Sequence, residues 1–172
     1  MPARASAISS SAIALENGRG NQAYCRRVPP LPGLRVIRSS IDGYGVVATR
    51  PFAAGEVIAE VDGVAWRDQD NLDDRYSLWI ADGLYFDMVD QTRWINHSCD
   101  PNAGVYTSGD GDGPIWARIV AKRAIEAGEE IAYDYAFPAH LAEPCRCGSP
   151  RCRGMIVDED ELPLPPSALK TA

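Results

Sequence analysis

The stretch of sequence that decides the fold is residues 93–102, which read Arg-Trp-Ile-Asn-His-Ser-Cys-Asp-Pro-Asn. Neither strand nor helix periodicity explains its polar centre, Asn-His-Ser-Cys, and an Asp-Pro turn follows it. A small protein rarely buries so many hydrogen-bonding groups together without a ligand that satisfies them. Residues 130–135, Glu-Ile-Ala-Tyr-Asp-Tyr, have a comparable density of hydrogen-bonding side chains, and we call residues 93–102 and 130–135 the two dense stretches. We therefore expect these two stretches to meet in space and form one site.

Composition narrows the class of protein. The 172 residues suit one domain that can bury a core, and 45% hydrophobic with 24% charged residues is typical of a soluble globular chain. The net charge of -7 makes a surface that coats DNA or RNA improbable and favours a basic protein partner. No apolar run approaches the ~20 residues of a membrane span.

The chain outside its two dense stretches is mostly short strands separated by Gly and Pro. A helix could occupy residues 68–80, with Asp70 or Asn71 as its N-cap. Alternation of strands and helices is missing, so a parallel sheet is not expected. The expected strands are residues 34–37, 46–48, 56–61, 84–87, 115–120 and 130–135.

A local echo supports a β-rich fold. Residues 50–58 and 123–131 both read Arg, an apolar residue two positions on, and then Gly-Glu before a strand. The pattern predicts a turn whose glycine takes a positive φ and starts a β-strand. Two copies indicate two similar small sheets, whereas a solenoid needs three or more repeats.

The five cysteines are Cys25, Cys99, Cys145, Cys147 and Cys152. The last three form a C-x-C-x4-C pattern that can present thiolates to one metal ion, and Cys99 is the obvious fourth ligand of a tetrahedral zinc site. Disulfides and free thiols are the alternatives. The odd count and the weak signal peptide argue against disulfides, and Cys25 is expected to be a free thiol.

Gly43-Tyr44-Gly45 allows two interpretations. Paired glycines let the backbone approach a ligand closely, but Asp42-Gly43 is also a strong signal for a plain hairpin turn. A dinucleotide fingerprint is excluded because the third glycine and the following helix are missing.

Four features in this order closely resemble the SET-domain protein lysine methyltransferases: residues 43–45, 93–102, 130–135 and the cysteine pattern, which is similar to the family's post-SET zinc module. The resemblance covers about residues 34–154. It indicates a minimal form with a short insert between Val61 and Leu84 and no cysteine-rich pre-SET region. The implied fold is mainly β, a β-clip of several small antiparallel sheets with few short helices and a C-terminal pseudoknot.

The resemblance also implies a division of the chain. We expect a flexible leader, a SET domain, a post-SET zinc-binding segment and a disordered acidic, Pro-rich tail. A transit peptide is the alternative for the leader. The acidic tail could also attract a lysine-rich substrate. The expected boundaries are residues 1–32, 33–138, 139–156 and 157–172.

Site residues follow from the same resemblance. It implies S-adenosylmethionine as cofactor, one zinc ion with four cysteine ligands, and a tunnel with tyrosine walls for the acceptor lysine. His97 as a general base is the less favoured alternative to a structural role, and isolated Tyr133 and Tyr135 could be simple strand aromatics. The implied catalytic residues are Tyr135, Tyr76 and Tyr133; the cofactor contacts are Asp42, Gly43, Tyr44, Gly45, Arg93, Asn96, His97 and Arg146; the zinc ligands are Cys99, Cys145, Cys147 and Cys152.

The implied function is S-adenosylmethionine-dependent methylation of a lysine in a basic, histone or histone-like, protein. A tyrosine at position 133 implies mono- or dimethylation. The alternative is a catalytically silent zinc-binding module that binds a partner protein. We expect no direct binding of nucleic acid or membrane, and a second copy of the chain could complete the substrate groove as a homodimer. The expected location is intracellular: cytoplasm or nucleoid in a microbe, nucleus or chromatin in a eukaryote or virus.

Overall fold

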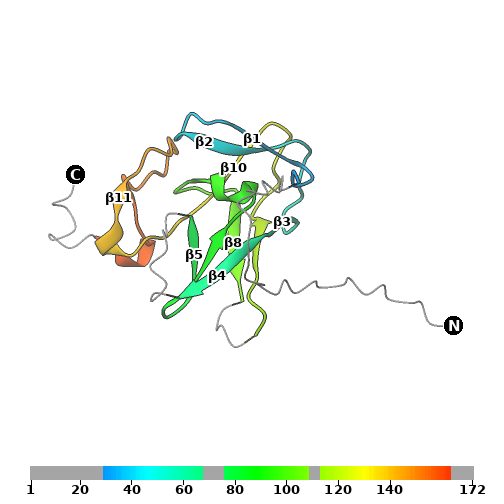
Figure 1. Cartoon of the computed structure of the whole chain (residues 1–172). Coiled ribbons are helices and arrows are strands. Elements are labelled where there is room, and N and C mark those ends of the chain that lie inside the picture. Colours follow the sequence, from blue (N-terminus) through cyan, green and yellow to red (C-terminus); the bar gives the residue numbers. More distant parts are fainter. Residues whose placement is uncertain (1–28, 68–75, 109–112, 164–172) are drawn as a thin grey trace, which may run out of the picture.

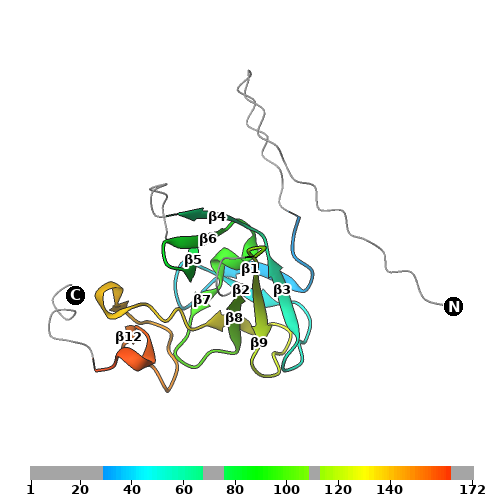
Figure 2. The same ribbon diagram turned by 90° about the horizontal axis from the view of Figure 1, so that it is seen from below.

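A computed structural model describes residues 29–67, 76–108 and 113–163 of the chain. Three small sheets surround a common core, and a C-terminal segment, residues 137–163, lies to one side of them (Figures 1 and 2). Within the described residues the helices are short 3-10 turns: η2 (Gln91–Trp94), η3 (Ala139–Leu141) and η4 (Glu159–Glu161). None of the described helices is long and apolar enough to cross a membrane. The expected β-rich fold is confirmed.

The first sheet carries both dense stretches of the sequence. Its order is β1 (Leu34–Arg38), β2 (Tyr44–Ala48), β10 (Glu130–Tyr133) and β7 (Asn96–His97). β2 pairs antiparallel with β1 and β10, but β10 and β7 run parallel. The parallel pair departs from the expectation of purely antiparallel sheets, and it is this pair that brings the two stretches together.

Two further three-stranded sheets complete the core. One has the order β3 (Val57–Val61), β9 (Ala117–Ala121), β8 (Ala103–Thr107), and the other β4 (Gly63–Arg67), β6 (Leu84–Met88), β5 (Ser77–Ala81). A short ribbon of β11 (Glu143–Pro144) and β12 (Met155–Ile156) forms part of the C-terminal segment. The core between the sheets includes side chains that are almost fully buried: Val46, Phe52, Ile80, Ile95, Ile119, Ile125 and Ile131.

The two echoed segments form the same turn. Gly55 and Gly128 both have positive φ, at 81° and 90°, and each is followed by a strand, β3 or β10, as predicted. The two copies also pair with each other, because Phe52 and Ile125 exchange backbone hydrogen bonds of 2.9 and 3.0 Å. The two similar segments therefore connect the first sheet, which contains β10, with the sheet that contains β3.

Two expectations are corrected by the structure. Residues 77–80 of the helix expected over 68–80 instead belong to strand β5 (Ser77–Ala81), because Leu78 and Ile80 face the core while Ser77 and Trp79 alternate outward. Residues 68–75 of that expected helix, like the leader residues 1–28, lie outside the described residues. Val157, the first residue of the tail expected to be disordered, is fully buried, so packing continues past that boundary.

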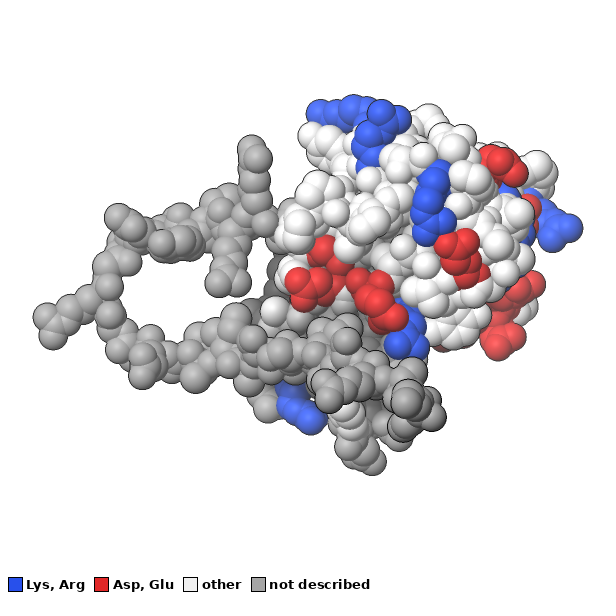
Figure 3. Space-filling model, turned by 90° about the vertical axis from the view of Figure 1, so that its right-hand side faces the viewer, with Lys and Arg blue, Asp and Glu red and all other residues white. Residues whose placement is uncertain are grey.

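Charges are mixed on the face seen in Figure 3. Acidic and basic side chains alternate over it, and the described residues of this face form no continuous basic surface.

Candidate active site

The two dense stretches meet at the end of the first sheet. Asn96 and His97 lie opposite Ala132 and Tyr133 in the parallel pair of β7 and β10. The hydroxyl group of Tyr135 donates a hydrogen bond of 2.7 Å to the carbonyl oxygen of Ile95. The expected convergence of residues 93–102 with residues 130–135 is therefore confirmed.

A cleft of about 870 Å3 opens beside this junction. That volume is within the range of small-molecule sites in proteins. One wall comes from residues 41–44, Tyr76 and the stretch that starts at Arg93, and the other from the C-terminal segment, including Phe137 and Arg146. The C-terminal segment thus forms a wall of the cleft and is not a free tail.

Aromatic rings and a cation line the mouth of the cleft. The ring of Trp94 lies between those of Tyr44 and Tyr76, with centroid distances of 5.4 and 5.5 Å. The guanidinium carbon of Arg93 stacks 4.3 Å above the ring of Tyr76. Arg93 Nε is buried and has no hydrogen-bond partner among the described residues. Because Arg93 lines the cleft, its guanidinium group can pair with an anionic group there.

Tyr135 is a neutral phenol held in a fixed orientation. Burial, followed by the charge of Asp42, raises the pKa of its hydroxyl group above the usual value, so it does not act as a base near neutral pH. Because its hydrogen is donated to Ile95, the oxygen keeps lone pairs that can accept from a donor in the cleft. Tyr135 can therefore orient an amine without deprotonating it.

His97 links the segment that follows β10 to the cysteines. Its Nδ1 accepts a hydrogen bond of 3.2 Å from the backbone N–H of Tyr135, and its Nε2 lies 3.3 Å from Cys99 Sγ. Burial lowers the pKa of the imidazole, partly offset by Asp134, so the ring is neutral near pH 7. A neutral ring that accepts at Nδ1 carries its proton on Nε2 and donates it to the sulfur. This arrangement gives His97 a structural role and not that of a general base.

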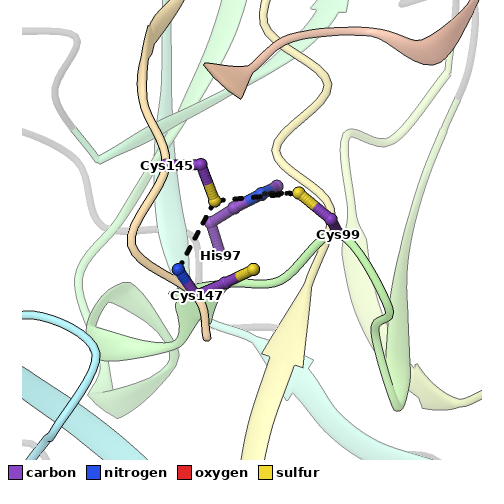
Figure 4. Close-up of side chains that lie close together, drawn as sticks. All are labelled: His97, Cys99, Cys145 and Cys147. Atoms are coloured by element: carbon purple, nitrogen blue, oxygen red, sulfur yellow. Dashed lines mark hydrogen bonds between the residues drawn. The ribbon is translucent and has the colours of Figure 1, made fainter. Parts of the chain in front are cut away.

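Three cysteines and His97 converge at the base of the C-terminal segment (Figure 4). The ligand atoms of His97, Cys99, Cys145 and Cys147 all lie within 4.8 Å of one another, and the sulfurs of Cys99 and Cys145 are 3.7 Å apart. Burial raises the pKa of Cys147, but hydrogen bonds from the backbone of Cys99 and Ser149 and from neighbouring thiols bring it to about 7. Such a cluster could hold a soft metal ion.

Cys152 lies next to this cluster. It is the most exposed of the four described cysteines, its Sγ accepts a hydrogen bond of 3.4 Å from the backbone N–H of Gly154, and it is not among the four residues whose ligand atoms lie within 4.8 Å of one another. His97 Nε2 cannot bind a metal while it carries its proton, whereas a thiolate can. The structure therefore groups three sulfur ligands with His97, and the proton on Nε2 is the feature that favours Cys152 over His97 as the fourth ligand.

The structure brings together most of the predicted site residues. Two are exceptions: Gly45 is buried beneath the side chain of Glu130, and Tyr133 packs behind Tyr135 with ring centroids 4.9 Å apart. Neither lines the cleft. The predicted residues that do line it are Asp42, Gly43, Tyr44, Tyr76, Arg93, Asn96, His97, Tyr135 and Arg146.

Sequence analysis missed several residues of the cleft. Trp94 stood inside the decisive stretch but had no role assigned to it, and Ser77 was placed in a helix. Phe137, Leu141 and Glu143 carry no local signal, because only the packing of the C-terminal segment places them at the cleft. Glu130 begins the second dense stretch, yet nothing in the sequence predicts its contact with Asn96.

Comparison with known proteins agrees with this geometry. The family model described as "SET domain" matches residues 43–136, more than half of the chain. The chain belongs to the SET-domain family. Its fold is similar to that in the crystal structure of KRYPTONITE in complex with mCHG DNA and SAH, with a TM-score of 0.63, 28% sequence identity, and coverage of 72% of this chain and 28% of that one. A second KRYPTONITE structure, with mCHH DNA, an H3(1-15) peptide and SAH, has a TM-score of 0.62 at 27% identity and covers 72% of this chain and 29% of that one.

Curated relatives of this SET domain include much longer proteins. Histone-lysine N-methyltransferase ash1 of Drosophila melanogaster is 34% identical over 153 residues, which cover 78% of this chain and 7% of the relative. Human histone-lysine N-methyltransferase 2B is 37% identical over 138 residues, which cover 70% of this chain and 5% of the relative. The chain thus spans less than a tenth of either relative.

Proposed function

We propose that the chain is an S-adenosylmethionine-dependent protein lysine methyltransferase. The observation that carries this proposal is the oriented hydroxyl group of Tyr135, on a residue that lines one cleft together with Tyr76, Asn96 and Arg93. The names of the relatives and the bound SAH of the structural neighbours support the same activity.

The donor groups of the cleft fit S-adenosylmethionine. Its amino-acid end carries a carboxylate, which Arg93 can pair with, and an ammonium group, which the Asn96 amide oxygen can accept from. When bound, the cofactor would supply a methyl group on a positively charged sulfur, which would take the bonding pair as the lysine nitrogen attacks the carbon and would leave as a thioether.

The protein's part in this reaction is positioning and desolvation. A lysine amine has a pKa of ~10.4 in water, so it must lose its proton to water before it can attack. The aromatic walls formed by Tyr76, Trp94 and Tyr135 disfavour the charged ammonium form. The oxygen of Tyr135 can then hold the neutral amine in line with the methyl group, and this positioning lowers the activation barrier.

We further propose that the C-terminal segment binds one zinc ion through Cys99, Cys145, Cys147 and Cys152. The close approach of the cysteine sulfurs supports the site, and tetrahedral thiolate coordination is typical of structural zinc. Because Arg146 and Cys147 line the cleft, a bound ion would fix one of its walls. Zinc would therefore support cofactor binding by holding the cleft wall in place, and it would take no part in the reaction.

The substrate that we infer is a lysine in a basic protein, a histone or histone-like protein above all. The relatives are named as histone-lysine methyltransferases, and one structural neighbour holds an H3 peptide. In a eukaryotic host this substrate places the protein in the nucleus. Tyr133 lies against Tyr135, with ring centroids 4.9 Å apart, which supports an indirect role in the number of methyl groups transferred, and the tyrosine at this position favours mono- or dimethylation.

The activity is tested by transfer of a radiolabelled methyl group to core histones, with Tyr135→Phe beside wild type. We expect the wild type to label a histone and the variant to lose at least roughly 100-fold in rate, since it lacks the orienting oxygen. Tyr106→Phe, at an exposed tyrosine on β8, is the matched control and should keep full activity. Cofactor binding by calorimetry without any methyl transfer would instead support a silent zinc-binding module.

A further inference from the structure

Glu130 reaches across the first sheet to the edge of the cleft. Its carboxylate accepts hydrogen bonds from Ser39 Oγ at 2.8 and 3.0 Å, and Oε1 also accepts from Asn96 Nδ2 at 2.9 Å. The side chain crosses directly over Gly45, where an added Cβ would lie 2.2 Å from Oε1. The missing side chain at position 45 is thus explained by Glu130, because Gly45 does not line the cleft.

These contacts decide which way the Asn96 amide points. Its Nδ2 donates to the carbonyl oxygens of Tyr44 and Asp42, at 2.9 and 3.3 Å, as well as to Glu130. All three neighbours are acceptors, so the reversed amide would place oxygen against oxygen. The orientation leaves Asn96 Oδ1 without a donor among the described residues, on a side chain that lines the cleft.

Of the three acceptors that contact the Asn96 amide nitrogen, only the Glu130 carboxylate belongs to a side chain, so only this one can be removed by mutation. The carbonyls of Asp42 and Tyr44 belong to the backbone of the loop before β2. Without the carboxylate, the Asn96 amide would keep only the two backbone acceptors, and the contact with Asp42 is long at 3.3 Å. Its orientation would be held less firmly, so the nitrogen could turn toward the cleft for part of the time. An amide nitrogen there would donate and would repel a cationic ligand group.

We propose that Glu130 is a positioning residue that holds Asn96 Oδ1 toward the cleft, so that this part of the cleft selects the α-ammonium group of the cofactor. The inference rests on the proposed function, which places the amino-acid end of S-adenosylmethionine beside Asn96 and Arg93. It assigns complementary roles to the two side chains: Arg93 donates to the carboxylate, and Asn96, set by Glu130, accepts from the ammonium group.

The test compares two ligands by calorimetry: S-adenosylhomocysteine and its analogue in which hydrogen replaces the α-amino group. The wild type should prefer the amino-bearing ligand by roughly 10- to 100-fold, as expected for a hydrogen bond to a charged group. Glu130→Ala should reduce that preference by roughly threefold or more, because one of the three acceptors that orient the Asn96 amide is lost. Glu130→Gln should retain it, because its amide oxygen can still accept from Asn96. Glu60→Ala, which removes an exposed glutamate on β3, is the matched control.

Gly45→Ala provides a second variant that leaves Glu130 in the sequence. The two nearest atoms in its way, Oε1 and Cδ, are the end of the flexible Glu130 side chain, and Ser39 Cβ at 3.0 Å needs only a small shift. We therefore expect the chain to fold and the carboxylate to be displaced. The preference for the amino-bearing ligand should fall as in Glu130→Ala. This variant keeps the proposal testable if Glu130→Ala does not fold.

The outcomes separate the inference from the proposed function. If Glu130→Ala and Gly45→Ala bind more weakly but keep the full preference, Glu130 is merely structural and the inference is overturned. If Asn96→Ala also keeps the preference, or the wild type shows none, Asn96 does not hold the ammonium group, and the inference falls too. Loss of methyl transfer in wild type with the ligand preference intact would sink only the proposed activity.

Discussion

The guanidinium group of Arg153 donates two hydrogen bonds of 2.7 Å to the carboxylate of Asp134, which lies between Tyr133 and Tyr135. Nη2 also donates to the carbonyl oxygen of Val157 at 3.0 Å. The Arg153 side chain is 11% exposed. This contact joins the C-terminal segment to Asp134, the residue directly after β10, and it needs no metal ion.

Arg153→Ala should therefore lower the free energy of unfolding by about 1–3 kcal/mol, because it leaves a half-buried carboxylate without its partner. Urea denaturation of the zinc-loaded protein measures the change. Arg151→Ala is the matched control: Arg151 is 79% exposed and 3.7 Å from Asp100, and we expect almost no effect. Equal losses in the two variants would show that the bidentate contact contributes nothing special.

Asn102 is a second joint, and it holds the two dense stretches together. Its Nδ2 donates to Glu129 Oε1 and to the backbone oxygen of Glu130, at 3.0 and 2.8 Å, while its Oδ1 accepts from the backbone N–H of Ala132 at 2.9 Å. The residue is only 4% exposed.

Asn102→Ala should cost about 2–4 kcal/mol of stability, because it leaves buried backbone groups without partners. Asn102→Asp, although nearly isosteric, should cost more near neutral pH, since it removes both donors and sets a carboxylate beside Glu129. Denaturant unfolding of the two variants gives the order. An aspartate variant as stable as wild type would contradict the assigned hydrogen bonds.

The sequence predicted the local turns of this fold better than the contacts between distant segments. The Arg-x-apolar-x-x-Gly-Glu echo predicted both turns, since a positive φ at Gly55 and Gly128 is a local requirement. It did not predict that Phe52 and Ile125 pair, because pairing depends on the distant chain. Strand β5 was missed for a related reason: its alternation spans five residues, and the polar run before it resembled a helix cap.

The candidate site divides in the same way. Dense polar motifs identified Asn96, His97 and Tyr135 because unusual chemistry is visible locally. The contacts of Glu130 with Asn96 and of Arg153 with Asp134 join positions 34 and 19 residues apart, and ordinary Glu and Arg residues give no sign of them. Gly45 shows the converse error. The glycine suggested a close approach of the backbone to a ligand, but the side chain of Glu130 fills the space beside it.

Acid should remove a contribution that Glu129 makes to stability. Burial raises the pKa of this carboxyl group, but hydrogen bonds from Arg123, Asn102 and the Glu126 backbone outweigh it and bring the pKa below the usual 4.5. A group with a lowered pKa in the folded state stabilises the fold above its unfolded pKa and loses this effect as pH falls through the folded one. The relevant window therefore lies below about pH 4.5.

We expect the stability difference between wild type and Glu129→Gln to be greatest near pH 7 and to shrink as the pH falls through that window. Urea unfolding of both proteins at several pH values measures it. Glu126→Gln is the control, because Glu126 is exposed and its side chain makes no hydrogen bond with the described residues. A difference that stays constant with pH would show that the charge of Glu129 is not responsible.

Tyr133→Phe should change the number of methyl groups transferred. Its hydroxyl group makes no hydrogen bond with the described residues, so its removal frees space behind Tyr135 at little cost in stability. Mass spectrometry of a methylated histone peptide should show a shift toward higher methylation states at similar total turnover. Unchanged multiplicity would remove Tyr133 from the product-determining role.

The fourth ligand of the metal cluster can be decided with Co2+ in place of zinc. The intensity of sulfur-to-cobalt charge-transfer absorption reports how many thiolates bind, and we expect the wild type to show four. Cys152→Ser should lose part of that intensity, whereas His97→Gln should retain it, because His97 Nδ1 accepts from Tyr135 and its proton lies on Nε2, toward Cys99. The reverse pattern, with intensity insensitive to Cys152 and shifted by His97→Gln, would make His97 the ligand. That result would also require the Tyr135 backbone N–H to find another acceptor, since metal binding at Nε2 moves the proton to Nδ1.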